Sequence, residues 1–294
     1  MDVLSDAVAA MRTGRPHSSR RDKHAPWGMR FAASEGAGLH VLLRGSAWLI
    51  PARGEPVALG TGDVVFLAHG RGHALASGLD VPLDGAVPRP AGNPPLKDPD
   101  AVMLCGYYAL DRGRTHRLLT ELPEVVHLPA TVGADRSLRA AVELLGMELE
   151  EREPGSDAIV TSLLDTLLLY VLRAWWRRER KGTGWSAALA DPAVGAALRA
   201  IHGDPAHPWT VEELGAAGGL SRAAFARRFT TLVGEPPLAY LTWWRMTTAG
   251  KLLREEDLPL RSVAERTGYT SEFAFAKAFK REYGMAPGQY RRRA

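Results

Sequence analysis

The final third of the chain contains one helical pattern twice, with an offset of fifty residues. The copies align at Ser221/Ser271, Phe225/Phe275, Phe229/Phe279, Gly234/Gly284, Pro237/Pro287 and Tyr240/Tyr290. In each copy a hydroxyl residue suited to an N-cap precedes two aromatics spaced to share one helix face, and a glycine that can end the helix follows. Chance rarely keeps so many residue types in register, so the sequence predicts two capped helices, each with one buried face.

A second short helix is expected upstream of each copy, over Val211–Ala217 and Arg261–Thr267, followed by a glycine turn at Gly219 or Gly268. Helix, short turn and helix form the helix-turn-helix arrangement, whose second helix can enter the major groove of DNA. A plain helical bundle would explain either copy alone. Two copies in register with basic outer faces favour DNA binding instead.

These residues resemble the DNA-binding region of the AraC/XylS-type transcription regulators, in which one helix joins two helix-turn-helix units. The similarity runs from Trp209 to Arg292 and is most specific in GYTSEFAFAKAFKREYGMAPGQYR, Gly268 to Arg291. One departure is the glycine-rich stretch Ala216 to Leu220, where the family usually has a better helix former. Because glycine within a helix costs about 1 kcal/mol relative to alanine, we expect this stretch to loosen the first unit.

The buried aromatics define which positions face DNA. They leave an outer set in each copy: Arg222, Ala223, Ala226 and Arg227 in the first, and Glu272, Phe273, Ala276 and Lys277 in the second. The resemblance implies that Arg227 and Lys277 read bases, and arginine can hold guanine O6 and N7 with two hydrogen bonds. Phe273 either contacts a thymine methyl group or packs on the linker helix. Further along, we expect Arg228, Lys280 and Arg281 to position phosphates.

The joining helix is predicted over Pro237–Arg254, with Leu238, Leu241, Trp244 and Leu252 available for a core. At 1.5 Å per residue it spans about 27 Å, against roughly 34 Å between successive major grooves on one face of DNA. A rigid linker of this length would let one subunit read two adjacent grooves.

Charge is unevenly distributed along the 294 residues, whose formal net charge is +4 and of which 46% are hydrophobic. From Pro192 onward there are 15 Lys or Arg against 10 Asp or Glu, whereas the preceding part carries 22 against 23. The basic excess therefore lies in the helical region, as expected of a surface that meets phosphates, although a solvated basic face would look the same.

Cysteine content and hydropathy favour a cytoplasmic protein with no membrane partner. The single cysteine, Cys105, excludes an internal disulfide. The N-terminal residues lack the long apolar core of a signal peptide. The most apolar segment, Ala158 to Trp176, contains Asp165 and ends in a charged run, so it is a poor candidate for a membrane span.

The first hundred residues contain short apolar or alternating runs, such as LHVLLRG and DVVFLA, punctuated by Gly and Pro. Such spacing predicts a small antiparallel barrel or sandwich. Gly62 to His73 resembles the second conserved motif of cupin barrels, with Ala68 in place of the usual proline. Leu39 to Gly45 is similar to a strand of the first motif, but the expected His-x-His and glutamate are absent. The whole chain thus resembles AraC-type regulators with a cupin sensor domain.

Three residues of this barrel are candidates for a metal or effector site: His40, His73 and Cys105. Imidazole and thiolate together suit zinc, and different strands of a small barrel can direct them into one lumen. The alternative is that all three are ordinary core or pocket-lining residues. His69 and Trp48 are weaker candidates for the same pocket.

The barrel domain contains one long loop, and two helices follow the domain. Residues Gly78 to Asp100 are rich in Pro and Gly and predict a flexible loop or a disordered one. Helices are then expected over Ser137–Glu151 and Asp157–Arg180, and the second carries an apolar stripe wider than one partner face needs. Packing on its own barrel and dimerisation both explain that stripe; symmetric dimers are the commonest oligomers, which favours a homodimer.

The sequence therefore predicts an α+β protein: a cupin-like antiparallel β-barrel over 1–134, a helical connector over 135–190 and an all-α double helix-turn-helix domain over 191–294. We expect a non-enzymatic, sequence-specific regulator, taken as an activator, that binds double-stranded DNA, a small-molecule or metal effector, and RNA polymerase. Rival interpretations are a constitutive DNA-binding protein whose barrel only dimerises, and a cupin metalloenzyme fused to a DNA-binding domain. A DNA-repair methyltransferase would need a cysteine cluster that this chain lacks.

Overall fold

The computed structural model describes residues 2–14, 16–85, 96–110, 117–130, 135–151, 153–179 and 184–293. The chain divides into two compact units. One, here the barrel unit, comprises Gly14–Arg112 and Leu119–Glu179. The other, the helical unit, comprises Arg180–Ala294 together with Met1–Thr13 and Gly113–Leu118.

The barrel unit contains two five-stranded sheets. The first has the order β1 (His17–Lys23), β9 (Ala101–Tyr108), β3 (Ala37–Arg44), β6 (Val64–Leu67) and β10 (Val126–Leu128). The second has the order β5 (Val57–Gly60), β4 (Ser46–Pro51), β7 (His73–Ala76), β2 (Gly28–Phe31) and β8 (Asp84–Gly85). All described pairings are antiparallel except that of β2 with β8. The expected antiparallel cupin-like architecture is confirmed.

A shared apolar core fills the space between these sheets. It is formed by alternate residues of facing strands, including Leu42 on β3, Leu49 on β4, Leu75 on β7 and Met103 on β9. Successive side chains of a strand point to opposite faces, so this set defines the inner face of each strand. The residues of the candidate site are assigned to the lumen by the same alternation.

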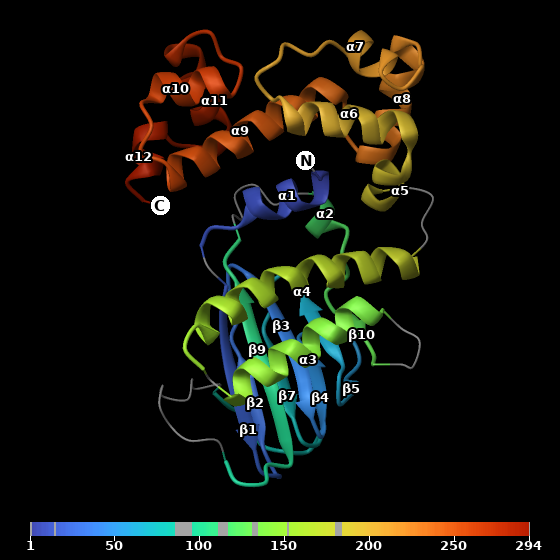
Figure 1. Ribbon diagram of the computed structural model, residues 1–294, viewed down its shortest axis with the longest axis vertical. Helices are drawn as coiled ribbons and strands as arrows, with labels where there is room; N and C mark the ends of the chain where they lie inside the picture. Colours follow the sequence, from blue (N-terminus) through green and yellow to red (C-terminus); the bar gives the residue numbers. More distant parts are fainter. Residues whose placement is uncertain are drawn as a thin grey trace. The chain divides into compact units, whose positions relative to one another are not determined.

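Two long helices cover the outside of the first sheet, α3 (Arg136–Glu151) and α4 (Ser156–Glu179), as Figure 1 shows. The Tyr108 hydroxyl on β9 donates a hydrogen bond to the Leu164 carbonyl of α4 over 2.5 Å. Among the described residues, Ser156–Arg178 is the one helix that passes a test of length and composition for a membrane span, with a mean hydropathy of 1.5. It packs against α3 and β10, as a core helix of a globular unit does.

The predicted loop over Gly78 to Asp100 is more ordered than expected where it is described. It contains the short strand β8, and the Leu96 amide donates to the Asp22 carboxylate of β1 over 3.1 Å. Residues 86–95 of that loop lie outside the described residues.

The helical unit consists of α5 (Trp185–Ala190), α6 (Pro192–Gly203), α7 (Val211–Ala216), α8 (Arg222–Val233), α9 (Pro237–Glu255), α10 (Leu260–Arg266), α11 (Glu272–Tyr283) and α12 (Pro287–Arg291), with α1 described below. Within it, the α7–α8 pair and the α10–α11 pair lie toward opposite ends of the long helix α9 (Figure 1). The repeat is confirmed in detail. Ser221 and Ser271 accept hydrogen bonds from the amides of Ala224 and Ala274, and left-handed Gly234 and Gly284 end the two helices.

The glycine-rich stretch before α8 has a packing role that the sequence did not reveal. A Cβ atom on Gly218 would lie 2.3 Å from the Ala193 Cβ of α6, and one on Gly215 would lie 3.0 Å from the Phe225 Cβ of α8. The first contact is sterically excluded for a larger residue, and the second would require the neighbouring atoms to shift. These glycines therefore allow α7 and its turn to approach α6 and α8, rather than merely loosening the first unit.

The first helix, α1 (Val3–Met11), belongs to the helical unit and not to the barrel with which the sequence grouped it. Its apolar face packs on α6 and α9. The Arg254 guanidinium of α9 donates to the carbonyls of Ala10 and Arg12, at 3.2 and 3.4 Å. The N-terminal residues thus help to build the helical unit, because six of the nine residues in this helix are buried.

Candidate functional site

The two repeated helices, α8 and α11, present the same positions to solvent. Their paired phenylalanines, Phe225 and Phe229 in α8 and Phe275 and Phe279 in α11, are completely buried. Arg222, Ala223 and Arg227 are exposed on α8, as are Glu272, Phe273 and Lys277 on α11, while Ala226 and Ala276 are partly exposed. Lys280 and Arg281 are also exposed. The geometry therefore makes each of the sequence-selected positions available to a ligand.

Phe273 is exceptional among them because 81% of its surface is exposed. Packing on the linker helix, the alternative considered for this side chain, would have buried the ring. A phenyl group held in water at the N-terminal end of α11 gains nothing from the fold, since burial of a phenylalanine is worth about 1.5–3 kcal/mol.

Arg228 differs from its neighbours in having a partner within the fold. Its Nε donates to the Asp191 Oδ2 over 2.6 Å, and a second nitrogen contacts the same oxygen. Asp191 also caps α6 by accepting from the Ala193 and Val194 amides. Burial opposes ionisation of Asp191, but the hydrogen bonds from Arg228 and these amides hold its pKa below the usual value. Arg228 therefore joins α8 to the N-terminal end of α6.

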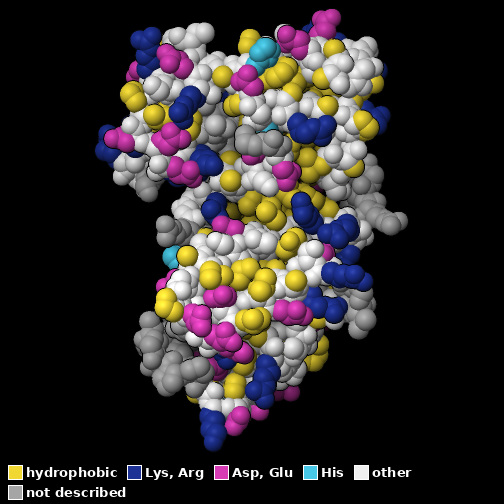
Figure 2. All heavy atoms as spheres, viewed as in Figure 1, with side chains coloured by type: hydrophobic (Ala, Val, Ile, Leu, Met, Phe, Trp, Pro, Cys, Tyr) yellow, Lys and Arg dark blue, Asp and Glu magenta, His cyan; other side chains and the backbone are white. Residues whose placement is uncertain are grey.

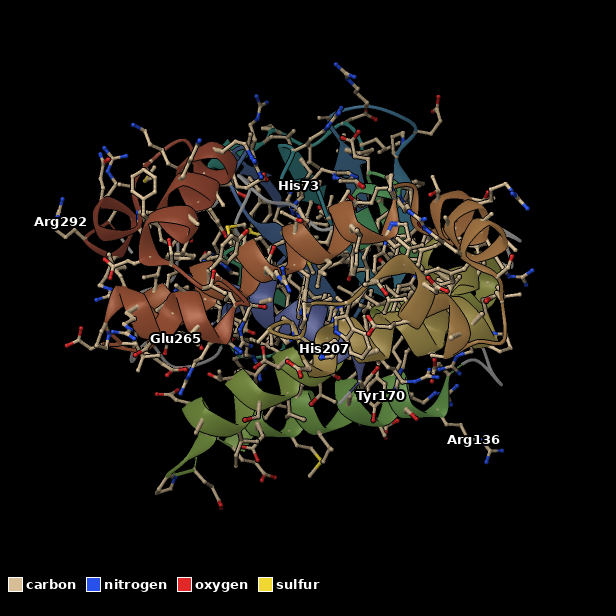
Figure 3. The ribbon with its side chains drawn as sticks, turned by 90° about the horizontal axis from the view of Figure 1, so that it is seen from above. His73, Arg136, Tyr170, His207, Glu265 and Arg292 are labelled. Atoms are coloured by element: carbon tan, nitrogen blue, oxygen red, sulfur yellow. The ribbon has the colours of Figure 1, made fainter. Side chains whose placement is uncertain are left out.

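The linker α9 is well anchored in the unit. Leu241 and Trp244 are buried as expected, whereas Leu238 is 43% exposed because it lies on the outer side of the first turn. A Cβ atom on Gly250 would lie 2.3 Å from the Tyr283 hydroxyl of α11, so this glycine permits close contact between the two helices. Exposed polar side chains such as Glu265 and Arg292 project away from the core of the unit (Figure 3).

In the barrel unit, His40, His73 and Cys105 line a single cavity of about 590 Å³, which lies within that unit. His40 on β3 is directly opposite Cys105 on β9, and His73 pairs with Phe31 across β7 and β2. Convergence of the three strands on one lumen is therefore as the sequence suggested. Trp48 lies between Ala47 and Leu49, whose side chains point inward, so the Trp48 side chain points outward. His69 hydrogen-bonds the Leu122 carbonyl over 2.9 Å. Neither residue therefore lines the cavity with His40, His73 and Cys105.

The two imidazoles contact each other directly. His40 Nε2 and His73 Nε2 share a hydrogen bond of 2.7 Å, and His73 Nδ1 lies 3.3 Å from the Arg71 carbonyl. Since a carbonyl can only accept, His73 carries its proton on Nδ1 and His40 donates from Nε2. Burial lowers the pKa of both rings, and the positive charges of His73 and Arg21 lower that of His40 further. The pair is therefore neutral at pH 7.

Cys105 is a buried neutral thiol. Burial raises its pKa to about 12, despite the opposing effect of Arg21, which hydrogen-bonds the sulfur, and of Lys23. A thiol in this state is a poor nucleophile and a poor metal ligand, because both roles need the thiolate. Arg21 could not be assigned to this site from the sequence, since β1 reads HSSRRDK and shows no apolar alternation.

These side chains do not fit the metal site that cupin barrels often hold. No group of three His, Cys, Asp or Glu residues within reach of one ion occurs among the described residues. The Nε2 atoms of the two histidines hydrogen-bond each other, the thiol is protonated, and a guanidinium lies beside the thiol.

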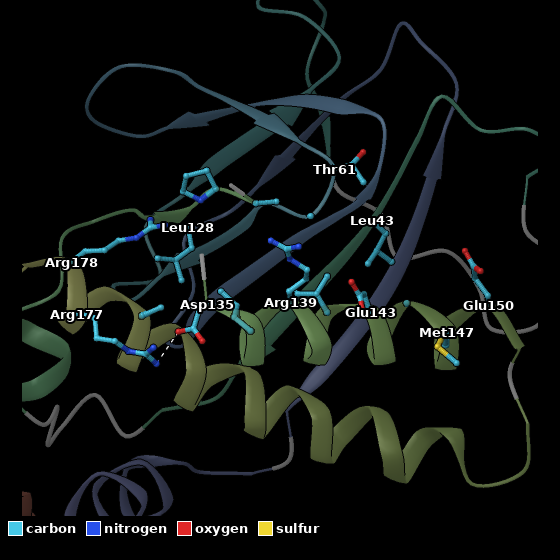
Figure 4. Close-up of a pocket in the computed structure, with 17 residues that line it drawn as sticks. Leu43, Thr61, Leu128, Asp135, Arg139, Glu143, Met147, Glu150, Arg177 and Arg178 are labelled. Carbon is cyan, nitrogen blue, oxygen red and sulfur yellow. Dashed lines mark ion pairs between the residues drawn. The ribbon is translucent and has the colours of Figure 1, made fainter. Parts of the chain in front are cut away.

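A second cavity, of about 780 Å³, lies between α3 and the first sheet (Figure 4). Leu43, Leu138 and Val142 form its apolar wall, and charged groups of both signs surround it. One pair, Arg177 and Asp135, is joined across 2.9 Å. The mixture of charges gives this cavity no net preference for an ion.

Known protein families match both the barrel unit and the helical unit. Residues 2–177 match the family described as Cupin, and residues 214–293 match the family described as Helix-turn-helix domain. A putative AraC-like transcription regulator of Streptomyces antibioticus is 34% identical over 99% of both chains. The activator RclR of Escherichia coli K12, described as RCS-specific, is 31% identical over 92% of both chains.

Among solved structures, the DNA-binding domain of AdpA in complex with a target DNA is similar to this chain. It is 34% identical, covering 35% of this chain and 91% of that domain with a TM-score of 0.33. The full-length likeness to the Streptomyces antibioticus protein and the match to both domain families identify the chain as a member of the AraC family of transcription regulators, with an N-terminal cupin domain and a C-terminal helix-turn-helix DNA-binding domain.

Proposed function

We propose that this regulator recognises a specific DNA sequence by placing α8 and α11 in two successive major grooves. The observation that carries the proposal is the equivalence of Arg227 and Lys277, which are both exposed two residues after a buried phenylalanine in a serine-capped helix. A linker of 19 residues spans about 28 Å, close to the distance between grooves.

Each position has a proposed role. Arg227 and Lys277 contact base edges, and the exposed Phe273 contacts a thymine methyl group. Arg222, Ala223 and Ala226 on α8, and Glu272 and Ala276 on α11, lie at the same surface and shape the fit to the groove. Lys280 and Arg281 bind phosphates. Arg228 contributes mainly by keeping α8 in place, because Asp191 already holds its guanidinium.

The barrel unit serves in this proposal as a sensor and not as an enzyme. His40, His73 and Cys105 line the effector cavity. A constitutive regulator is the closest rival, and effector-dependent affinity for the operator separates the two. The relative RclR is named an activator, which supports activation through contact with RNA polymerase as the mode of action. Because the proposed ligand is DNA, we propose the cytoplasm as the location of the protein.

We also assign dimerisation to the outer faces of α3 and α4. Leu144 and Met147 on α3 are 50% and 54% exposed, and Ile159 on α4 is 44% exposed. Figure 2 shows hydrophobic side chains at the surface over these helices. Most of the apolar stripe of α4 is buried or partly buried within the unit, and the exposed Leu144, Met147 and Ile159 are the side chains that we propose meet a second copy of the chain.

The test of DNA reading is a comparison of specific with non-specific binding. An operator is selected from random DNA with the full-length protein, and affinity is measured for Arg227→Ala, Lys277→Ala and the control Arg261→Ala. Arg261 is an exposed basic residue of the same unit that pairs with Glu265 on its own helix. Each reading variant should lose roughly 5-fold to 100-fold on the operator and much less on random DNA. Equal losses on both DNAs would show that these residues contact only phosphate.

A further inference from the structure

The inner face of β1 brings positive charge into the barrel. Ser19 and Arg21 lie on the same face of β1, opposite Cys105 and Met103 of β9, and Lys23 follows on that face. Arg21 is only 7% exposed, and its Nε donates to the Ser19 hydroxyl over 3.2 Å. Because guanidinium groups remain protonated in proteins, a full positive charge lies in the wall of the lumen.

No acidic residue occurs among the described residues that line this cavity. Two carboxylates of the same unit pair with other arginines. Asp22 points to the other face of β1 and pairs with Arg20 at 2.8 Å, and Glu124 pairs with Arg71 at 3.3 Å. With both histidines neutral and the thiol protonated, the charged side chains that line the cavity among the described residues are the guanidinium groups of Arg21, Arg30 and Arg71, so the field in the lumen is positive. A divalent cation is repelled there, whereas an anion is attracted in a medium that screens charge weakly.

One side of the wall is aromatic and apolar, although polar side chains such as Ser18, Ser34 and Arg30 line other parts of it. The Phe31 ring stacks on His73 with centroids 4.7 Å apart and planes 4° apart, and it is tilted against His40 at 5.0 Å. Leu67 and the backbone at Gly38 complete this side, where a Cβ atom on Gly38 would lie 3.4 Å from the Leu67 Cδ1. Because Gly38 has no side chain, there is room for a planar group beside the rings. Aromatic stacking would stabilise that group.

We propose that the barrel lumen binds a small organic anion, a monocarboxylate attached to a planar apolar body, with its carboxylate on Arg21 and its body against Phe31, His40 and His73. The proposal rests on the sensor role stated above and specifies its ligand class. Arg21 is suited to it because a guanidinium offers a planar fork of donors to a carboxylate. Its bonds to Ser19 and Cys105 hold that fork in position.

The experiment is calorimetric titration of the full-length protein with phenylacetate, with phenylacetamide as a neutral compound of the same shape, and with zinc chloride. We expect phenylacetate to bind and phenylacetamide to bind at least about 10-fold more weakly, because the amide cannot form the charge-assisted pair. This comparison uses the unaltered chain and does not depend on a variant that folds. Equal binding of acid and amide, no binding of phenylacetate up to about 10 mM, or stoichiometric zinc binding would each overturn the proposal.

Variants locate the site. Arg21→Gln should weaken phenylacetate binding at least about 10-fold and Arg21→Lys should restore part of it. Arg139→Gln, in the wall of the second cavity, should have no effect. Loss with Arg139→Gln but not with Arg21→Gln would assign the anion to the cavity under α3 and overturn the proposal. Operator binding is measured on the same preparations, so a wrong ligand class remains distinguishable from a failure of DNA recognition.

Discussion

His40 and His73 hydrogen-bond each other through their Nε2 atoms at 2.7 Å inside the barrel, and burial keeps both rings neutral. The unfolded chain takes up protons on these rings below pH of about 6.5, whereas the folded pair resists protonation. The unfolded state therefore binds more protons in that range, and stability should fall as the pH drops below the ordinary imidazole pKa.

The measurement is the melting temperature at pH about 7.5 and about 5.5, for the wild type and for His40→Gln with His73→Gln. The wild type should lose more on acidification than the double variant. His202, whose pKa burial also lowers, is present in both proteins, so the difference isolates the barrel pair. Identical losses would mean that the barrel pair takes up no fewer protons than it does in the unfolded chain.

Asp191 and Arg228 provide a second prediction, in the helical unit. Asp191→Ala removes the cap of α6 and leaves the Arg228 side chain without its partner, so we expect a loss of at least about 1 kcal/mol in unfolding free energy. Arg228→Ala should lower stability as well, whereas Arg227→Ala, on the neighbouring position, should not. Chemical denaturation of the three variants checks this order. If Arg228→Ala is as stable as Arg227→Ala, the ion pair contributes nothing to the fold.

Gly218 tests the packing of the first helix-turn-helix unit. Gly218→Ala should be destabilising, because the new methyl group meets Ala193 at 2.3 Å unless the backbone moves. Gly288→Ala is the matched control, since a Cβ there meets nothing within 4 Å. Thermal melts should show a lower midpoint only for the first variant, and DNA affinity should fall with it. If both substitutions stabilise the protein, the higher helix propensity of alanine outweighs the close packing at Gly218.

The contrast between these glycines shows where sequence reasoning succeeds. Serine caps, paired phenylalanines and closing glycines act within a few residues, so local pattern predicted α8 and α11 and their exposed positions correctly. The requirement for glycine at position 218 comes from its contact with Ala193 of α6, which lies twenty-five residues earlier in the chain. A pattern of neighbouring residues cannot predict such a contact. Propensity alone therefore suggested a weak helix where the fold needed a small side chain.

The barrel follows the same division. Apolar alternation predicted the strands β3 and β6. In the structure β3 pairs with β9, so His40 lies opposite Cys105. The polar strand β1 has no such signal, so Arg21, one of the charges that line the lumen, could not be assigned to the site from the sequence. Contacts with Ser19 on β1 and with Cys105 on β9 offset part of the cost of burying this charge.

The first helix gives the last prediction, because α1 packs on α6 and α9. His202 of α6 stacks on Trp244 at 3.7 Å and hydrogen-bonds the Tyr240 hydroxyl at 2.6 Å, while its Nδ1 lies 3.7 Å from the Asp6 carboxylate of α1. Leu4 is buried in the same region. Leu4→Ala should therefore destabilise the helical unit by about 2 kcal/mol or more.

Hydrogen exchange on the full-length protein locates the effect. With Leu4→Ala, exchange should accelerate in α6 and α9, around Tyr240 and Trp244, and remain unchanged in β3 and β9. Ser5→Ala, at a more exposed position of the same helix, is the control and should leave both regions protected. Faster exchange confined to the barrel strands would place α1 with the barrel, as the sequence alone had suggested. The expected pattern would instead make the N-terminal residues part of the DNA-binding unit, because a helix can stabilise only the elements on which it packs.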